Sequence, residues 1–201
     1  MKELSANIEY FQNVEYVHRD RFGNIKQMFQ ENELCRFLIK KEWLSPTWIN
    51  KKYAKFIAPF LGFWSDRRVV ANLVTSAGKA AIASRINGSG GEALFDKIGW
   101  GTGAVAAAAG DTALGAEKDA SGGASTTHVV SAATCTRVTT SVTNDTAQMV
   151  GTATATGTIA ITESGVFNAA SAGTLLARQV FTAVNVVSGD SIQFTWKIQA
   201  S

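Results

Sequence analysis

Cysteine, proline and histidine are scarce in this chain, whose 201 residues include only two of each. Cys35 and Cys135 stand far apart, and neither belongs to a Cys-x-x-Cys pair. A disulfide scaffold or a structural zinc site needs closely spaced cysteines or histidines. We therefore expect neither, and the scarcity of proline leaves extended segments free to pair as strands.

Long apolar runs are also missing. The longest ones are far shorter than the roughly 20 residues of a bilayer-spanning helix, so no membrane partner is expected. The first residues, Met1-Lys2-Glu3-Leu4, lack the basic and then apolar pattern of a signal peptide, so secretion by that route is not expected. Hydrophobic residues still make up 46% of the chain, which excludes a wholly disordered protein.

Charge is unevenly distributed along the chain. Residues 1–72 hold 12 basic and 8 acidic residues, a net charge of +4, whereas residues 73–201 hold 7 and 8, a net charge of −1. The overall charge of +3 is too small to indicate a nucleic-acid partner. The break indicates a change of architecture or exposure between the two parts.

Residues 1–32 predict an N-terminal β-hairpin region. Two extended segments, 13–19 and 25–30, flank Asp20–Asn24, whose glycine and asparagine can supply the positive φ of a tight reversal. Residues 33–86 then predict a helical, aromatic-rich excursion. Its first helix shows an apolar face at helical spacing, and its last helix begins at a capping Thr75 or Ser76 and ends before Asn87-Gly88.

Residues 87–201 predict an antiparallel β-sandwich. Segments rich in Thr and Val alternate with Gly, Asn, Asp and Ser turns, and β-branched residues favour a pleated, half-buried surface. The clearest pattern is at the end, where Ile192, Phe194, Trp196 and Ile198 share one face and polar residues share the other. The fold class is therefore mainly β, and we expect this last strand to lie inside a sheet.

A convergent catalytic set is not evident, so we expect no catalytic, cofactor-binding or metal-ligating residue and no enzyme. His18 and His128 fall in different parts of the chain, and His128 follows a strand pattern. The glycine-rich segment 99–104 lacks the third glycine and the Gly-Lys-Ser/Thr that phosphate binding requires, so it predicts a structural turn. Glu163 is interpreted as an exposed or hydrogen-bonded charge at a strand end, and the aspartates in turns as backbone caps.

The segment 40–68 interleaves basic and aromatic residues and is the candidate docking arm. Aromatic and arginine side chains are favoured anchors of protein interfaces. The predicted partner-binding residues are Trp43, Trp48, Phe60, Phe63, Trp64, Arg67 and Arg68. Three alternatives stay open: an extension that packs its own aromatics, a nucleic-acid strip and a membrane-surface helix.

Four blocks of the sequence resemble those of small structural proteins of tailed bacteriophages. The blocks are Val17–Lys26, Asn72–Ala81, Ile98–Gly103 with Ala109–Leu114, and Ile161–Phe167 with Leu175–Arg178. The last block is similar to the strand pair of tail-fibre and collar-type domains. The segment Leu34–Arg68 is additional to the shortest versions of the pattern. The resemblance implies a β-rich, non-enzymatic virion component that works in multiple copies.

These observations predict a virion structural protein, assembled in the bacterial host cytoplasm, with other virion proteins and its own copies as partners. The favoured role is a tail, neck or fibre-attachment protein. One alternative is a decoration protein on the capsid surface. Another is a carbohydrate- or receptor-binding module, for which Trp100 is the only tryptophan expected on a loop of the sandwich.

Overall fold

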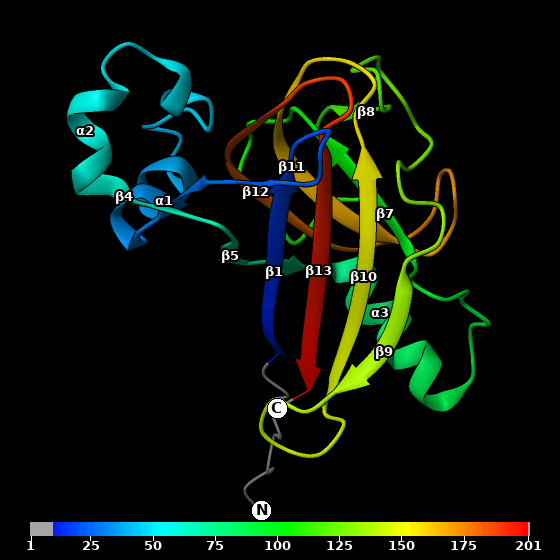
Figure 1. The fold of residues 1–201 in the computed structure, drawn as a ribbon. Coiled ribbons are helices and arrows are strands. Elements are labelled where there is room, and N and C mark those ends of the chain that lie inside the picture. Colours follow the sequence, from blue (N-terminus) through cyan, green and yellow to red (C-terminus); the bar gives the residue numbers. More distant parts are fainter. Residues whose placement is uncertain (1–9, 201) are drawn as a thin grey trace, which may run out of the picture.

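The computed structural model describes residues 10–200 and has two antiparallel sheets packed face to face, which confirms the mainly β sandwich (Figure 1). The first sheet has the strand order β2-β1-β13-β10-β9, and β5 also pairs with β1. Its strands are β1 (Tyr10–Arg19), β2 (Ile25–Lys26), β5 (Arg68–Ala71), β9 (Thr134–Val138), β10 (Thr146–Thr154) and β13 (Ser191–Ala200).

The second sheet has the order β6-β12-β11-β7-β8. Its strands are β6 (Leu73–Val74), β7 (Lys97–Gly101), β8 (Glu117–Lys118), β11 (Ile159–Phe167) and β12 (Leu175–Val186). A small separate sheet pairs β3 (Met28–Glu31) with β4 (Gly62–Ser65). The core lies between the two large sheets and includes Ile98 and Trp100 of β7 and Phe181 of β12.

The last strand follows its sequence pattern. Ile192, Phe194 and Trp196 are fully buried, and β13 lies between β1 and β10, as predicted. The strand therefore closes the core instead of forming an edge. Gln199 was expected on the solvent side but is buried, because its amide donates hydrogen bonds to Ser141 and Asp145 in the loop before β10.

Strand β1 belongs to the sandwich and not to a separate N-terminal hairpin region. It does form a hairpin with β2, and Gly23 has the predicted positive φ of 86° in the turn. That hairpin includes only two residue pairs, however, whereas β1 pairs with β13 along its whole length. The strand expected from residue 25 to residue 30 is divided, because β3 leaves the hairpin to pair with β4. The first nine residues of the predicted 1–32 region lie outside the described part.

The predicted excursion interrupts the strand that pairs with one edge of β1. Residues Arg19 and His18 of β1 pair with Ile25 and Lys26, and Tyr16 pairs with Arg68 of β5. Strands β2 and β5 therefore follow one another along the same edge of β1, with only the place opposite Val17 between them. The chain leaves that edge after Lys26 and returns to it at Arg68. We call residues 27–67 the insertion.

The insertion folds around a small core of its own, and Figure 1 shows it to one side of the sandwich. Its elements besides β3 and β4 are α1 (Glu33–Lys40), the 3-10 helix η1 (Trp48–Asn50) and α2 (Ala54–Leu61). The Asn32 side chain caps α1 by accepting from the Cys35 N–H. Its core consists of Phe29, Cys35, Ile39, Trp48, Ala54 and Leu61.

Helix α3 (Ser76–Asn87) packs on the sandwich and not within the insertion. Its ends match the sequence signals: the Thr75 hydroxyl accepts from the Gly78 N–H, and Gly88 adopts the left-handed conformation with φ 68°. Thr75 also donates to the Leu175 carbonyl of β12, which fixes the start of the helix on the sheet. The segment that the sequence predicted as one excursion, 33–86, therefore contains an inserted unit followed by elements of the sandwich.

Candidate partner-docking surface

Thr182 on β12 is the point at which the insertion attaches to the sandwich. The pairing of β12 with β11 shifts next to it, between Ile161 and Glu163 of β11, so the backbone groups of Thr182 are available to other partners. Its N–H donates to Glu31 Oε1 at 2.6 Å, and its carbonyl accepts from Arg68 Nη1.

A second pair of contacts reinforces this attachment. Trp48 Nε1 donates to the Thr182 hydroxyl at 3.2 Å, and the next residue, Ala183, donates its N–H to the Pro46 carbonyl at 2.9 Å. The groups of Thr182 therefore hold side chains from β3, η1 and β5 together. The attachment is polar and directional, so it fixes the orientation of the insertion relative to the sheet.

Two of the predicted docking residues are inside this attachment. Trp48 is 0% exposed and Arg68 is 1% exposed, so neither can reach a partner, and their assignment to the docking surface is wrong. The guanidinium of Arg68 lies 5.9 Å from the ring of Tyr16 and 6.0 Å from the ring of Phe181. Tyr16 is itself completely buried, and its burial raises the pKa of its hydroxyl well above the ordinary value. The positive charge of Arg68 acts in the opposite direction.

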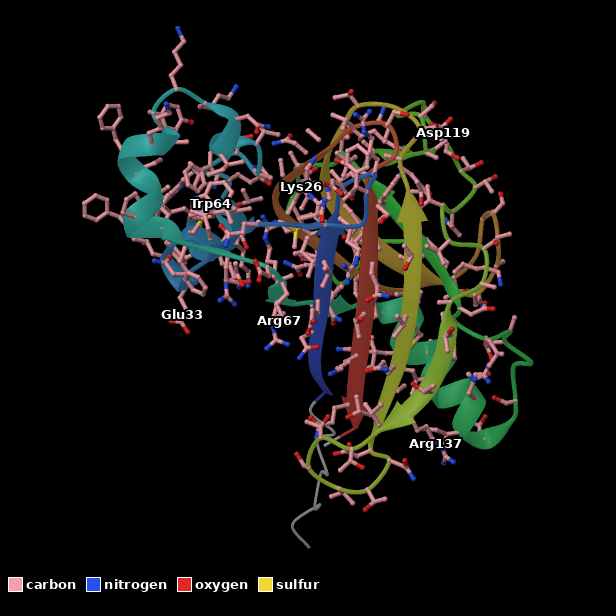
Figure 2. All side chains as sticks on the ribbon, viewed as in Figure 1. Lys26, Glu33, Trp64, Arg67, Asp119 and Arg137 are labelled. Atoms are coloured by element: carbon pink, nitrogen blue, oxygen red, sulfur yellow. The ribbon has the colours of Figure 1, made fainter. Side chains whose placement is uncertain are left out.

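The other predicted residues, Trp43, Phe60, Phe63, Trp64 and Arg67, are exposed, and the structure adds four apolar side chains to them. Figure 2 shows Trp64 on the insertion, where its ring packs against the buried Phe29. The exposed large apolar side chains of the insertion are Leu34, Phe37, Trp43, Tyr53, Phe56, Phe60, Phe63 and Trp64. We call these eight residues the apolar surface.

Helix α2 explains why aromatic rings remain outside. Ala54 and Leu61 are its buried residues and face the small core, whereas Phe56 is 79% and Phe60 75% exposed. Phe56 and Phe60 are four residues apart and therefore lie on one face of the helix. The spacing was visible in the sequence and could have identified Phe56. The sequence did not indicate which side of the helix faces the core.

Five exposed lysines belong to the same insertion as the apolar surface. Lys40, Lys41, Lys51, Lys52 and Lys55 are exposed, and none of them forms an ion pair within residues 10–200. Arg67 contacts Glu15 at 3.6 Å, but this pair is well exposed and contributes little. The insertion therefore exposes both apolar rings and positive charges that have no ion-pair partner among the described residues.

Two hollows flank the attachment of the insertion. One has a volume of about 270 Å³ and is lined by residues that include Glu31, Arg36 and Asn72. The other has a volume of about 430 Å³ and is lined by residues that include Trp64, Lys26 and Asn185. The seam between the insertion and the sandwich lies between these hollows. Besides the bonds of Thr182, it includes hydrogen bonds between the side chains of Asn50 and Asn185.

The two histidines form separate structural pairs. His18 is buried, and its Nε2 lies 3.0 Å from Asp190 Oδ2, which also accepts from Lys26 Nζ at 2.7 Å. Burial lowers the pKa of His18, although its hydrogen bond to Asp190 acts in the opposite direction. Within residues 10–200, no group of three or more His, Cys, Asp and Glu side chains could hold a metal ion.

His128 is buried, whereas its strand pattern in the sequence indicated a strand-surface or half-buried position. Its Nδ1 lies 2.6 Å from Glu117 Oε1, and its ring stacks on that of Phe167 at 3.8 Å between centroids. This pair ties the loop before β9 to β8 and to the end of β11. The arrangement is that of a packed structural histidine.

The glycine-rich segment after β7 surrounds a buried carboxylate. Glu163 is 0% exposed and accepts from the N–H groups of Gly103, Gly115 and Ala116 at 2.7–2.9 Å. A Cβ at Gly103 would lie 2.4 Å from Glu163 Oε1, so the glycine is required for this approach. The structural turn predicted for residues 99–104 is not formed, because residues 99–101 belong to β7 and residues 102–104 are irregular. Glu163 was expected as an exposed or hydrogen-bonded charge at a strand end. It is hydrogen-bonded, but it is buried in the middle of β11.

Trp100 is also inside. It is 0% exposed on β7, and its Nε1 donates to the Asp119 carbonyl at 3.2 Å. The carbohydrate-binding alternative relied on Trp100 as an aromatic group on an exposed loop, and that expectation is wrong. The exposed aromatic residues are concentrated on the insertion instead.

No family model, curated protein or solved structure matches the chain. Within the described residues, no helix is both long and apolar enough to cross a membrane. The surface of the insertion is thus the feature from which a function can be argued.

Proposed function

We propose that this protein is a structural component of a tailed-phage virion, a tail, neck or fibre-attachment protein that assembles through protein contacts of its insertion. The sandwich is the framework, and the insertion is the docking unit. The observation that carries the proposal is the apolar surface: eight large apolar side chains are exposed on a unit whose own core has six buried residues.

The position of the insertion supports this division of roles. The insertion takes the place of the single residue that would lie opposite Val17 of β1. Pairing along this edge of β1 would therefore be continuous without the insertion. Exposed apolar clusters on a soluble protein mark interaction sites, because leaving them in water costs free energy that a partner can recover. The attachment at Thr182 holds the rings in place before binding, which lowers the entropy lost on association.

The test is incorporation of a triple variant, Phe56→Ala with Phe60→Ala and Phe63→Ala, into purified particles. Since these rings are exposed, folding should be unaffected, and incorporation should fall at least tenfold, because each buried aromatic anchor contributes about 2 kcal/mol or more to an interface. Quantitative immunoblotting of particles against the soluble pool measures it.

A matched control carries Ile86→Ala, Leu94→Ala and Val142→Ala, which remove three exposed apolar side chains outside the insertion. This control should incorporate normally. Normal incorporation of the Phe56, Phe60 and Phe63 variant, or equal loss in the control, would contradict docking by the insertion. Absence of the wild-type protein from particles would contradict the virion role itself.

The alternative of a capsid decoration protein uses the same surface in a different stoichiometry. A tail, neck or fibre-attachment protein is present in low copy with ring symmetry, whereas a decoration protein occurs in hundreds of copies. Gel densitometry against the major capsid protein separates the two roles.

A further inference from the structure

The acidic groups of the sandwich are engaged within the molecule. All eight acidic residues after position 72 accept hydrogen bonds from, or form ion pairs with, groups of the same chain. They are Glu92, Asp96, Asp111, Glu117, Asp119, Asp145, Glu163 and Asp190. Two described acidic residues of the sandwich lie before position 72: Glu15 contacts Arg67, and Asp20 accepts hydrogen bonds from the N–H groups of Phe22 and Asn24. Within residues 10–200, every carboxylate of the sandwich therefore has a partner in the same chain.

The insertion has the opposite balance. Its five lysines at positions 40, 41, 51, 52 and 55 have no ion-pair partner within residues 10–200, and only Glu33, Glu42 and Asp66 are exposed acids between residues 33 and 67. Figure 2 shows Asp119 at the side of the sandwich remote from Trp64 and the insertion. A second copy of the chain is thus poorly suited to receive this surface.

We infer that the partner of the insertion is a different protein with an acidic groove lined by apolar side chains. This inference rests on the proposed docking function and adds the chemistry of the partner. Charge complementarity indicates the sign of the partner: a unit that exposes lysines together with apolar anchors fits a groove that offers carboxylates together with apolar side chains. The carboxylates would pair with lysines that have no ion-pair partner among residues 10–200.

The side chains of β4 favour a partner with a groove over a partner with a flat surface. Phe63 and Trp64 are consecutive strand residues, so their side chains point to opposite faces, and both are exposed. A bilayer accepts one apolar face of an amphipathic element. It would leave one of these two rings in water, whereas a groove can contact both.

The geometry of the rings argues against single-stranded nucleic acid. Nucleic-acid sites of this kind present open ring faces on which successive bases stack. Here Trp43 packs edge-to-face on Phe37 at 6.0 Å, and Trp64 packs edge-to-face on the buried Phe29 at 5.8 Å. These rings are already fixed by partners within the insertion, as anchors of a protein interface are.

Carbodiimide cross-linking of intact particles tests the inference, because this reagent joins a lysine amine only to a carboxylate in direct contact. We expect Lys51, Lys52 or Lys55 to be joined to Asp or Glu of another virion protein, identified by mass spectrometry of the cross-linked peptides. Links to carboxylates of a second copy, or no links from these lysines, would overturn it. So would photo-cross-linking of the insertion to nucleic acid or lipid.

Charge reversal provides a second measurement. The double variant K52E/K55E should lower incorporation about tenfold or more, because two like charges would face the acidic groove. The control K79E/R137E changes the net charge equally on exposed positions of the sandwich, and Figure 2 shows Arg137 far from the insertion. It should incorporate normally. Equal effects of the two variants would contradict the inference.

Different experimental results would contradict docking by the insertion and the acidic character of its partner. If the aromatic triple variant is excluded from particles while K52E/K55E incorporates normally, docking by the insertion stands and the acidic partner is wrong. If the wild-type protein is missing from particles, both proposals fail.

Discussion

At the scale of single residues, the most constrained group of the sandwich is Glu163. Besides three backbone N–H groups, its Oε2 accepts from Arg178 Nε at 2.9 Å, and Arg178 Nη1 donates to Asp111 at 2.7 Å. Glu163 and Arg178 are almost completely buried, so each compensates the charge of the other in the interior. These scarce charges of the sandwich are thus engaged in the cohesion of the fold.

Replacing Glu163 by Gln should therefore destabilise the protein strongly. The change leaves Arg178 with a single carboxylate partner and places an amide nitrogen where N–H donors need an acceptor, at a cost of about 3–5 kcal/mol. Denaturant-induced unfolding measures this cost. The variant Glu92→Gln, at a partly exposed carboxylate, should change stability far less, because water screens its interactions. A small effect at Glu163 would contradict its structural role.

At the scale of elements, strand β12 positions the candidate surface. Its irregular pairing with β11 leaves the backbone of Thr182 available, and β3, η1 and β5 use it. Cys35 packs in the core of the insertion behind this seam and is fully buried. Burial, together with the nearby charge of Glu31, raises the pKa of the Cys35 thiol to about 12.

Cys35 can therefore report on opening of the insertion. The thiolate is the reactive form, so at pH 8 a Cys135→Ala protein should react slowly with a thiol reagent through Cys35. Glu31→Ala in that background removes both the acceptor of the Thr182 N–H and a charge that raises the pKa of the Cys35 thiol. Both changes act in the same direction. The lost hydrogen bond alone should accelerate the reaction about 10- to 100-fold, since a buried hydrogen bond to a charged group contributes about 1.5–3 kcal/mol.

Asp66→Ala is the matched control, because it removes an exposed carboxylate at the end of the insertion without touching the seam. Its reaction rate should equal that of the parent. If Glu31→Ala leaves the rate unchanged as well, Thr182 is not the group that holds the insertion closed.

At the scale of the whole molecule, the sandwich is assembled from both ends of the chain. β1 covers the full length of β13, and β5, β6 and α3 also precede residue 87. A fragment of residues 87–201 would expose one edge of β13 and lack Val14, Tyr16 and Val70 of the core. The domain limits predicted from the sequence thus do not coincide with the packing of the described residues.

Deletion of the insertion should be tolerated far better than loss of the N-terminal third. A protein in which a single glycine joins Lys26 to Arg68 restores one continuous strand beside β1 and should unfold in one cooperative transition. The fragment 87–201 should show no cooperative transition, because its first sheet lacks a central strand. Thermal unfolding followed by near-ultraviolet circular dichroism distinguishes the two. A cooperative fragment or an unfolded deletion protein would contradict the assignment.

The sequence by itself determined the features that depend on near neighbours. The alternation in residues 191–198 identified the buried face of β13, because successive side chains of a strand point to opposite sides. The caps of α3 at Thr75 and Gly88 were predictable for the same reason, since hydrogen bonds at helix ends involve residues three or four positions away.

Only the tertiary structure decided which aromatic residues of the docking segment are available. Trp48 and Phe60 are both apolar rings in the same segment, yet Trp48 is buried because its indole meets Thr182, 134 positions along the chain. That Lys26 and Arg68 adjoin the same strand is equally nonlocal, because it follows from their separate pairing with β1. Such contacts depend on how distant strands are paired, and residue type and spacing along the chain do not specify that pairing.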